Sequence, residues 1–332
     1  MPWKGEKDPY KIWLSEIILQ QTRVEQGLNY YENFIISFPD IHQLANAENN
    51  QVFKLWEGLG YYTRCRNLLA TARYISAELQ GNFPSTYDEI LKLKGVGTYT
   101  AAAISSFAYN LPHAVVDGNV VRVIARIFGI NKPFDTTDGK KFFAAFAEKL
   151  LDKNQPGIYN QAIMDFGAVI CKPVTPLCAV CIFQKTCFAF QHNKTGVLPV
   201  KAKKITIRNR WFNYLVLTHR NEVLIHERTA SDIWRHLFEF ILIESKKEEN
   251  SATILKAALK NKTLELNSYT IKSCSPVLKQ QLSHQLIRGL VIELQLPDKI
   301  FMSGSHYWVK KTELEKYPFP KFINQYLDQL FN

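Results

Sequence analysis

The sequence predicts a multidomain protein with a mostly α-helical first half, which contains a helix-hairpin-helix and a cysteine-rich subdomain, and an α+β second half. Three observations support this prediction. At 332 residues the chain is long enough for two or three domains. Two helical patterns flank a turn that contains Gly95 and Gly97. After a basic stretch near residue 200 the apolar period changes from helical to alternating.

The composition indicates a folded protein that binds a polyanion. Apolar residues make up 46% of the chain and charged residues 21%, which excludes a disordered or low-complexity chain. No apolar run approaches the roughly 18 residues of a membrane span, and the first residues lack the core of a signal peptide. We therefore expect a cytoplasmic protein. The net charge of +11 favours nucleic acid as the partner, although a merely basic soluble protein is the alternative.

The first predicted helix begins at Asp8, which can cap it, with Pro9 in the first turn. Helical spacing from Ile12 and Trp13 places Glu16 on the apolar face. Desolvation there would favour the protonated acid and raise its pKa, as a general acid requires. A glutamate on an amphipathic helix is usually solvated, so the position alone makes this a hypothesis.

A helix-hairpin-helix is predicted over residues 87–109, where Gly95 and Gly97 bracket a tight turn and a second helix begins at Thr98. The free N–H groups of a helix start bind phosphate oxygens, and Lys92 and Lys94 lie near the turn. The alternative is an ordinary glycine-capped connection between two packed helices. If the turn contacts DNA, it positions the protein without reading sequence.

A second carboxylate, Asp117, follows an apolar run and directly precedes another helix. That helix has an apolar stripe at helical spacing: Val120, Val123, Ile124 and Ile127. A helix N-terminus would keep Asp117 ionised, although a simple capping role is the alternative. One neutral and one ionised carboxylate in a single pocket can cleave a glycosidic bond through an oxocarbenium-like transition state.

Four of the six cysteines follow a C-x6-C-x2-C-x5-C spacing: Cys171, Cys178, Cys181 and Cys187. In a reducing cytoplasm such a group indicates thiolate ligands rather than disulfides. A single C-x2-C flanked by isolated cysteines favours an iron–sulfur centre, with a structural zinc site as the alternative. We expect the other two, Cys65 and Cys274, to be buried small apolar residues.

The second half begins after a stretch, residues 191–221, that contains no acidic residue and reads as an interdomain linker. Alternating patterns then predict paired strands at 211–219 and 222–228, with further strands at 237–244 and 286–294. A helix is predicted between them at 251–260, and this helix carries no acidic residue.

Together these motifs resemble the adenine DNA glycosylases, the MutY family, within the helix-hairpin-helix superfamily that includes endonuclease III. The resemblance covers nearly the whole chain. It is carried by the cysteine run and by four segments: WLSEIILQQT at 13–22, GLGYY at 58–62, LKGVGTYTA at 93–101 and VVDGNVVRV at 115–123.

The resemblance implies a 4Fe-4S cluster on the four cysteines. It also implies a monomer that acts on double-stranded DNA and flips out an adenine paired with 8-oxoguanine or guanine. The implied domains are a six-helix barrel with the helix-hairpin-helix over 1–113, an iron–sulfur cluster domain over 114–192, a basic linker over 193–208, and a Nudix-like lesion-recognition domain over 209–332. Because the helix at 251–260 lacks the expected glutamates, the Nudix-like domain should recognise rather than hydrolyse.

The resemblance also implies roles for individual residues. Glu16 corresponds to the acid that protonates the adenine ring nitrogen and later handles water. Asp117 corresponds to the carboxylate that stabilises or traps the sugar cation, and Tyr99 and Asn119 to their hydrogen-bonding partners.

Further residues correspond to DNA contacts. Gln21 and Tyr61 correspond to wedges in the duplex, and Trp3 and Gln161 to the adenine pocket. Ser283 and His284 match the family's Phe-Ser-His loop, which reads the 8-oxoguanine strand. Leu282 replaces the family's Phe and so removes an aromatic stacking surface.

Position 99 separates this chain from endonuclease III-like enzymes, which carry a lysine nucleophile there. Tyr99 therefore predicts weak or absent strand cleavage. Two alternatives stay open at this point. One is a bifunctional glycosylase and AP lyase that acts on damaged pyrimidines, and the other is a non-enzymatic iron–sulfur protein that binds DNA.

Overall fold

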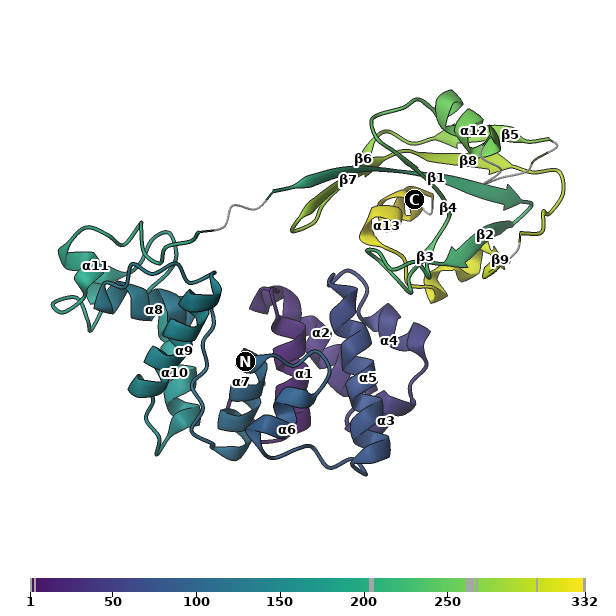
Figure 1. Ribbon diagram of the computed structural model, residues 1–332. Coiled ribbons are helices and arrows are strands. Elements are labelled where there is room, and N and C mark those ends of the chain that lie inside the picture. The colour runs from purple at the N-terminus through teal and green to yellow at the C-terminus, as the bar shows by residue number, and fades with distance from the viewer. Residues whose placement is uncertain are drawn as a thin grey trace. The chain divides into compact units, whose positions relative to one another are not determined.

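The computed structural model describes residues 2, 4–202, 206–260, 266, 268–302 and 304–330. The chain forms two compact units, one of residues 1–47 and 63–204 and the other of residues 48–62 and 205–332. The first unit is helical and the second is α+β (Figure 1). This confirms the predicted fold class. None of the described helices is both long and apolar enough to cross a membrane.

The helical unit is built around α1 (Pro9–Leu19), which packs against α2 (Val24–Ser37) and α7 (Thr98–Tyr109). It begins as the sequence predicts, because the Asp8 side chain accepts a hydrogen bond from the Tyr10 backbone N–H at 2.9 Å. Trp13 and Leu14 are fully buried. The other helices are α2 (Val24–Ser37), α3 (Ile41–Asn46), α5 (Tyr62–Glu78), α6 (Tyr87–Lys92), α7 (Thr98–Tyr109), α8 (Gly118–Phe128), α9 (Thr137–Leu150), α10 (Pro156–Val169) and α11 (Phe188–Gln191).

The predicted apolar stripe after Asp117 forms the buried face of α8. Val120 and Ile124 are about 1% exposed and pack against Phe143 of α9. The chain then runs through the cysteine segment to α11, and Leu198 packs against Cys187 and Ala189. The boundary between the two compact units falls at 204/205, within the stretch that the sequence predicts as a linker. The predicted domain boundaries stay predictions.

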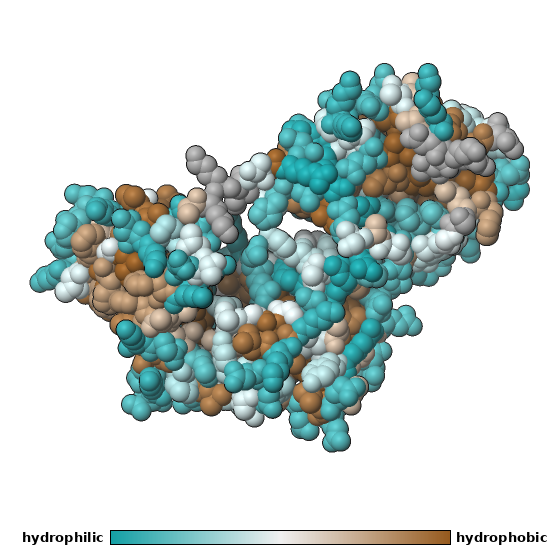
Figure 2. Space-filling view, viewed as in Figure 1, coloured by the Kyte–Doolittle hydropathy of each residue, from teal (hydrophilic) through white to brown (hydrophobic). Residues whose placement is uncertain are grey.

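The helical unit also has an apolar groove, visible as hydrophobic surface around α8 and α10 (Figure 2). Its lining comes from four parts of the unit, namely α8, the end of α9, α10, and residues 182–183. Ile182 and Phe128 leave 83% and 49% of their surface exposed there. None of the predicted site residues lines this groove, so it is distinct from the predicted site.

The second unit is a mixed sheet with helices on both faces. Its strands are β1 (Arg208–His219), β2 (Glu222–Glu227), β3 (Phe238–Glu239), β4 (Ile241–Ser245), β5 (Thr270–Cys274), β6 (Leu278–Gln281), β7 (Gln285–Gly289), β8 (Val291–Gln295) and β9 (His306–Lys310). β1 and β2 form the predicted antiparallel pair, with Thr218 opposite Val223. β1 also pairs antiparallel with β4 and parallel with β7 and β8. The unit also contains α4 (Asn49–Leu55), α12 (Ser251–Lys260) and α13 (Lys321–Leu330).

Side chains that alternate along β1 explain why helices cover both faces of the sheet (Figure 1). Leu215 and Leu217 pack in one core with Ile254 of α12. Tyr214 points the other way, and its ring lies 6.1 Å from that of Phe322 in α13. α12 has the bounds that the sequence predicts.

Two predicted strands are each divided in the structure. The strand at 286–294 is interrupted at Leu290, because Gly289 packs directly on the Phe212 backbone and the Asn213 side chain accepts a hydrogen bond from the Leu290 N–H. The strand at 237–244 is interrupted at Phe240.

The two isolated cysteines differ in environment. Cys65 is fully buried, as predicted. The prediction for Cys274 is wrong, because this residue is exposed. It ends β5, which pairs only with β8 among the described strands and whose residues are all exposed.

Candidate active site

Glu16 is a buried carboxyl group, because the helical spacing of α1 turns it inward with Ile12 and Trp13. Only 7% of its surface is exposed. Burial raises the pKa of Glu16 to about 7 and outweighs the opposing effect of a hydrogen bond from the Tyr99 side chain. The negative charge of Asp117 raises this pKa further. Near neutral pH a large share of Glu16 therefore carries the proton that a general acid needs.

Tyr99 joins the two carboxylates, since its pKa responds to the charges of both Glu16 and Asp117. It lies in the first turn of α7, directly after the hairpin turn. Burial and the two negative charges raise the pKa of Tyr99 far above its ordinary value, so its hydroxyl remains a hydrogen-bond donor. Glu16, Tyr99 and Asp117 therefore lie close enough to interact electrostatically.

Asp117 lies at the start of α8, as the sequence predicts, and its side chain caps this helix. One carboxylate oxygen accepts a hydrogen bond from the Val120 N–H at 2.7 Å, and the other accepts one from the Asn119 side chain at 2.6 Å. These bonds favour the anion, but burial outweighs them and raises the pKa of Asp117 above its ordinary value. The helix start alone predicts the opposite direction. Burial decides the direction in which the pKa of Asp117 shifts, and the extent of burial cannot be predicted from the position of a capping residue.

Arg122 is a functional candidate that the sequence reasoning missed. Its guanidinium donates to the Asn119 side-chain oxygen at 2.8 Å and to the Cys171 carbonyl at 2.7 Å. It is only 8% exposed. Arg122 therefore connects the residue that holds Asp117 to the first cysteine of the cysteine run. The sequence did offer a sign of this contact. Arg122 is a charged residue in a largely apolar helix, and it lies three residues after Asn119, so the two share one helix face.

The four cysteines line one pocket of the helical unit. Arg126 lies beside them, with a guanidinium nitrogen 3.5 Å from the Cys171 sulfur, and it also donates to the carbonyls of Lys172, Pro173 and Leu198. Four thiols of this kind suit either an iron–sulfur cluster or zinc. Across the described ranges, no three His, Cys, Asp or Glu side chains are placed to hold a metal ion.

The predicted adenine pocket is described only in part, because Trp3 lies outside the described residues. Gln161 lies on α10, and its side-chain nitrogen donates to Asp165 at 3.1 Å. Lys4 forms an ion pair with the same carboxylate at 2.6 Å. Lys4 and Asp165 were not predicted, although Asp165 lies four residues after Gln161 and so on the same helix face.

The hairpin turn has the predicted position, between α6 and α7. Gly95 needs its φ of +83°, and a Cβ there would lie 2.7 Å from the Asn67 side chain. Gly97 has an extended backbone, and a Cβ would meet nothing within 4 Å. The fold therefore requires glycine at 95 but not at 97. A close approach by a partner, such as a phosphate group at the start of α7, would explain Gly97.

The two predicted wedge residues have left-handed backbones. The φ angles are +57° at Gln21 and +50° at Tyr61. Such angles are uncommon outside glycine and are concentrated at functional sites. Both residues are exposed, with 42% of the Tyr61 surface accessible.

Ser283 and His284 lie in the tight connection from β6 to β7. Both are exposed, and the Leu282 N–H donates to the Gln285 carbonyl across the turn. The His284 carbonyl accepts a hydrogen bond from the Arg208 N–H, which ties the turn to β1. The Ser283 hydroxyl contacts that of Tyr61 within the second unit.

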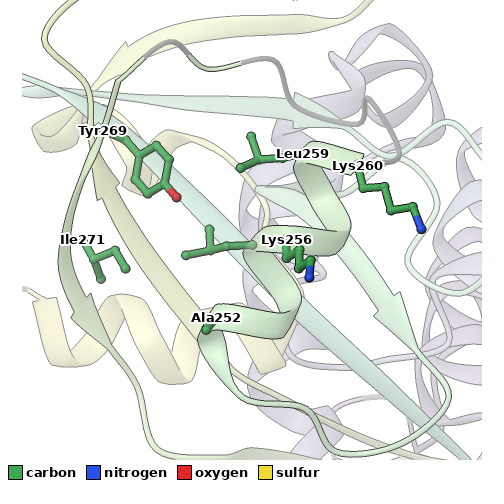
Figure 3. Close-up of a pocket in the computed structure, with 7 residues that line it drawn as sticks. Ala252, Lys256, Leu259, Lys260, Tyr269 and Ile271 are labelled. Atoms are coloured by element: carbon green, nitrogen blue, oxygen red, sulfur yellow. The ribbon is translucent and has the colours of Figure 1, made fainter.

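A pocket on the sheet face that α12 covers is lined by apolar side chains and two lysines, Lys256 and Lys260 (Figure 3). The remaining lining residues are Ala252, Leu255, Leu259, Tyr269 and Ile271. None of the seven is acidic. They include no carboxylate of the kind that holds magnesium in pyrophosphate hydrolases.

Comparisons with known proteins agree with this geometry. Residues 14–153 match the family model of the HhH-GPD superfamily base excision DNA repair proteins, and residues 213–329 match that of the NUDIX domain. Among solved structures, a thermostable thymine-DNA glycosylase has a TM-score of 0.54 at 31% identity, over 58% of this chain and 88% of that one. An endonuclease III in a non-covalent DNA complex has a TM-score of 0.51 at 21% identity, over 57% and 86% of the two chains, and shows the fold alone.

Several relatives in sequence share the name adenine DNA glycosylase. The adenine DNA glycosylase of Homo sapiens is 39% identical over 200 residues, which are 58% of this chain and 37% of that protein. That of Buchnera aphidicola subsp. Baizongia pistaciae (strain Bp) is 39% identical over 249 residues, which are 72% of this chain and 68% of the relative. Sequence similarity at this level over most of both proteins shows that the chain belongs to the adenine DNA glycosylases, the MutY family of base excision DNA repair enzymes.

Proposed function

We propose that this glycosylase hydrolyses the N-glycosidic bond of adenine paired with 8-oxoguanine or guanine in duplex DNA, after the adenine nucleotide is flipped out. One observation carries this proposal. Tyr99 hydrogen-bonds a Glu16 carboxyl group whose pKa is about 7, and Asp117 acts electrostatically on both. A proton donor and a carboxylate so arranged suit cleavage through an oxocarbenium-like transition state.

The proposed reaction has two steps. Glu16 gives its proton to a ring nitrogen of adenine, the bond between base and sugar breaks, and the electron pair leaves with the base. The Asp117 carboxylate, oriented by Asn119 and the Val120 N–H, stabilises the sugar cation. Glu16, now ionised, accepts a proton from the attacking water, which restores the acid and yields an abasic site.

The same residues favour hydrolysis without strand cleavage. Lyase chemistry needs an amine that forms a Schiff base with the sugar. Position 99, where endonuclease III-like enzymes carry that lysine, holds a tyrosine that keeps its proton. We therefore assign a monofunctional glycosylase.

A three-duplex assay tests this function. Single-turnover reactions should release adenine opposite 8-oxoguanine and opposite guanine, and should leave duplexes with oxidised pyrimidines intact. Borohydride should trap no enzyme–DNA adduct, because Tyr99 cannot form an imine. Release of oxidised pyrimidines with a trapped adduct would establish the lyase alternative. Binding without any base release would establish the non-enzymatic one.

We further propose that the four cysteines hold a 4Fe-4S cluster, which would fix the loop from Cys171 to Cys187 for DNA binding. Support comes from their spacing and from the single pocket that they line. When purified without oxygen, the protein should contain about four iron and four acid-labile sulfide per chain. Cys181→Ser should lose most of both, whereas Cys274→Ser, which changes an exposed cysteine of β5, should lose neither. Zinc in place of iron would contradict the cluster.

The proposal assigns the DNA contacts as the resemblance implies them. Gln21 and Tyr61 would fill the gap left by the flipped nucleotide, and the turn with Gly95 and Gly97 would bind a phosphate. Gln161 and Trp3 would contact the adenine. Ser283 and His284, at the exposed turn between β6 and β7, would recognise the opposite strand. We propose the domain boundaries 1–113, 114–192, 193–208 and 209–332 on the same basis.

A further inference from the structure

α1 ends in an arrangement that its own sequence does not supply. A helix leaves its last carbonyl groups unpaired and carries partial negative charge at that end. The last turn of α1 contains no basic residue. Arg64 of α5 supplies the positive charge instead, because its guanidinium donates to the carbonyls of Ile17 at 3.0 Å and Ile18 at 2.8 Å.

Arg64 also holds the loop that follows α1. The same guanidinium donates to the Gln20 carbonyl at 2.5 Å and to the Thr22 hydroxyl at 3.2 Å. Gln21 lies between these two residues, exposed and with a φ of +57°. Such a left-handed backbone is strained in a residue other than glycine, and persists only where neighbouring contacts enforce it.

The Gln20 side chain does not compete for this role, since it donates to Thr100 of α7 at 3.1 Å. The loop is therefore held from two sides. Thr100 of α7 binds the Gln20 side chain, and Arg64 of α5 binds the Gln20 backbone. Gln21 itself stays exposed.

The face of α5 that carries Arg64 also supports the hairpin turn. Asn67 lies against Gly95, and the Thr71 hydroxyl donates to the Lys94 carbonyl at 2.9 Å. Positions 64, 67 and 71 follow helical spacing, so all three lie on one side of α5. One helix face thus supports both the Gln21 loop and the turn that the proposed function assigns to phosphate binding.

We propose that Arg64 is a positioning residue for base extrusion. It holds residues 20–22 in the strained conformation that points Gln21 into the duplex, while Glu16 on the same helix stays in place to protonate the base. This inference rests on the proposed function, because it assumes that Gln21 acts as a wedge. Lysine could keep at most the contacts that one guanidinium nitrogen makes, to the carbonyls of Ile17, Ile18 and Gln20. It would lose the bond that the second nitrogen donates to the Thr22 hydroxyl.

Arg64→Met and Arg64→Lys test the inference, with Arg66→Met as the matched control. Arg66 is on the same helix, and its guanidinium donates to Thr63 of that helix. In the free proteins, hydrogen exchange at residues 20–23 should accelerate in both Arg64 variants and stay at the wild-type rate in Arg66→Met. Thermal melting checks that each variant folds. If Arg64→Met does not fold, the comparison of Arg64→Lys with wild type decides the outcome.

The second readout is extrusion, followed by the fluorescence of 2-aminopurine in place of the target adenine, together with the single-turnover rate. Arg64→Met should reduce the extent of base extrusion and the single-turnover rate by about 10- to 100-fold each, as expected for lost hydrogen bonds to a charged group. Combined with Gln21→Ala, it should add little to the slower single variant, because both changes remove the same wedge. The pH at which the rate falls by half should stay where wild type has it.

Three outcomes would overturn the inference: unchanged exchange at residues 20–23, fully additive effects of Arg64→Met and Gln21→Ala, or a shifted pH midpoint, which would mean that Arg64 acts through Glu16. Failure of the proposed function looks different. Wild type itself would then release no adenine from any duplex, while the exchange data, which need no DNA, would still show whether Arg64 holds the loop.

Discussion

Glu16→Gln should lower the single-turnover rate of adenine release by about 10³- to 10⁴-fold, while the affinity for the mispaired duplex changes by less than about threefold. Glutamine has nearly the same shape as the protonated acid and can still accept the hydrogen bond from Tyr99, so the buried site keeps its packing. It cannot give a proton to the base. The loss should therefore fall on the chemical step alone.

The pH dependence of wild type gives an independent check on Glu16. Because burial raises its pKa to about 7, the acid is protonated below that pH, and the rate should fall as pH rises through about 7. Stability should also change with pH, but over a range that begins lower. Between the ordinary value of 4.5 and about 7, the folded state binds more protons than the unfolded state, so the free energy of unfolding decreases as pH rises.

Glu16→Gln lacks this titration and should be more stable than wild type at pH 8, by about 3 kcal/mol, with the difference vanishing near pH 4. Denaturant unfolding at the two pH values measures it. Glu25→Gln, at an exposed position of α2, is the matched control and should change neither rate nor stability. If Glu16→Gln released adenine at the wild-type rate, another group would have to supply the proton.

Asp117→Asn should slow adenine release by about 10³-fold, because it removes the negative charge that faces the sugar cation and leaves the shape of the side chain. The asparagine oxygen can still accept from the Val120 N–H, so the cap of α8 survives. Its NH2 then faces the Asn119 NH2, and the loss of that hydrogen bond should cost about 1 to 3 kcal/mol of stability. Single-turnover kinetics and thermal unfolding of the same preparation separate the two effects.

Asp40→Asn provides the matched control for this substitution. Asp40 also caps a helix, α3, and accepts a hydrogen bond from the Gln43 N–H at 2.9 Å, but it lies on the surface. Its replacement should leave the rate of adenine release unchanged. If Asp117→Asn lowers the rate only in proportion to its loss of folded protein, Asp117 is merely a capping residue.

Local patterns were sufficient to predict many of the elements and their ends. The start of α1 at Asp8 and Pro9, the turn at Gly95, the cap at Asp117 and the β1–β2 hairpin all lie where the sequence places them. Each depends on interactions within a few residues, such as a side chain that caps its own helix or a turn between adjacent strands. Contacts of this range depend only on neighbouring residues in the sequence, so the sequence alone can predict them.

Long-range packing decided what the sequence reasoning missed or mistook. Arg64 reaches the end of α1, and Arg122 reaches the Cys171 carbonyl 49 positions away, so no spacing rule could pair them. Cys274 is exposed because it lies in β5, which pairs only with β8 among the described strands. The division of the strand at Leu290 likewise depends on the Asn213 side chain of β1.

By itself, the sequence singled out the groups that we propose to be reactive: a glutamate on an apolar helix face, an aspartate at a helix start, and four grouped thiols. Only the tertiary structure decided the direction in which the pKa values of the two carboxyl groups shift. Burial raises the pKa of both Glu16 and Asp117, although the helix start alone would lower that of Asp117. The physical reason is that desolvation depends on every segment packed around a charge, whereas a cap or a helix terminus depends on a single turn.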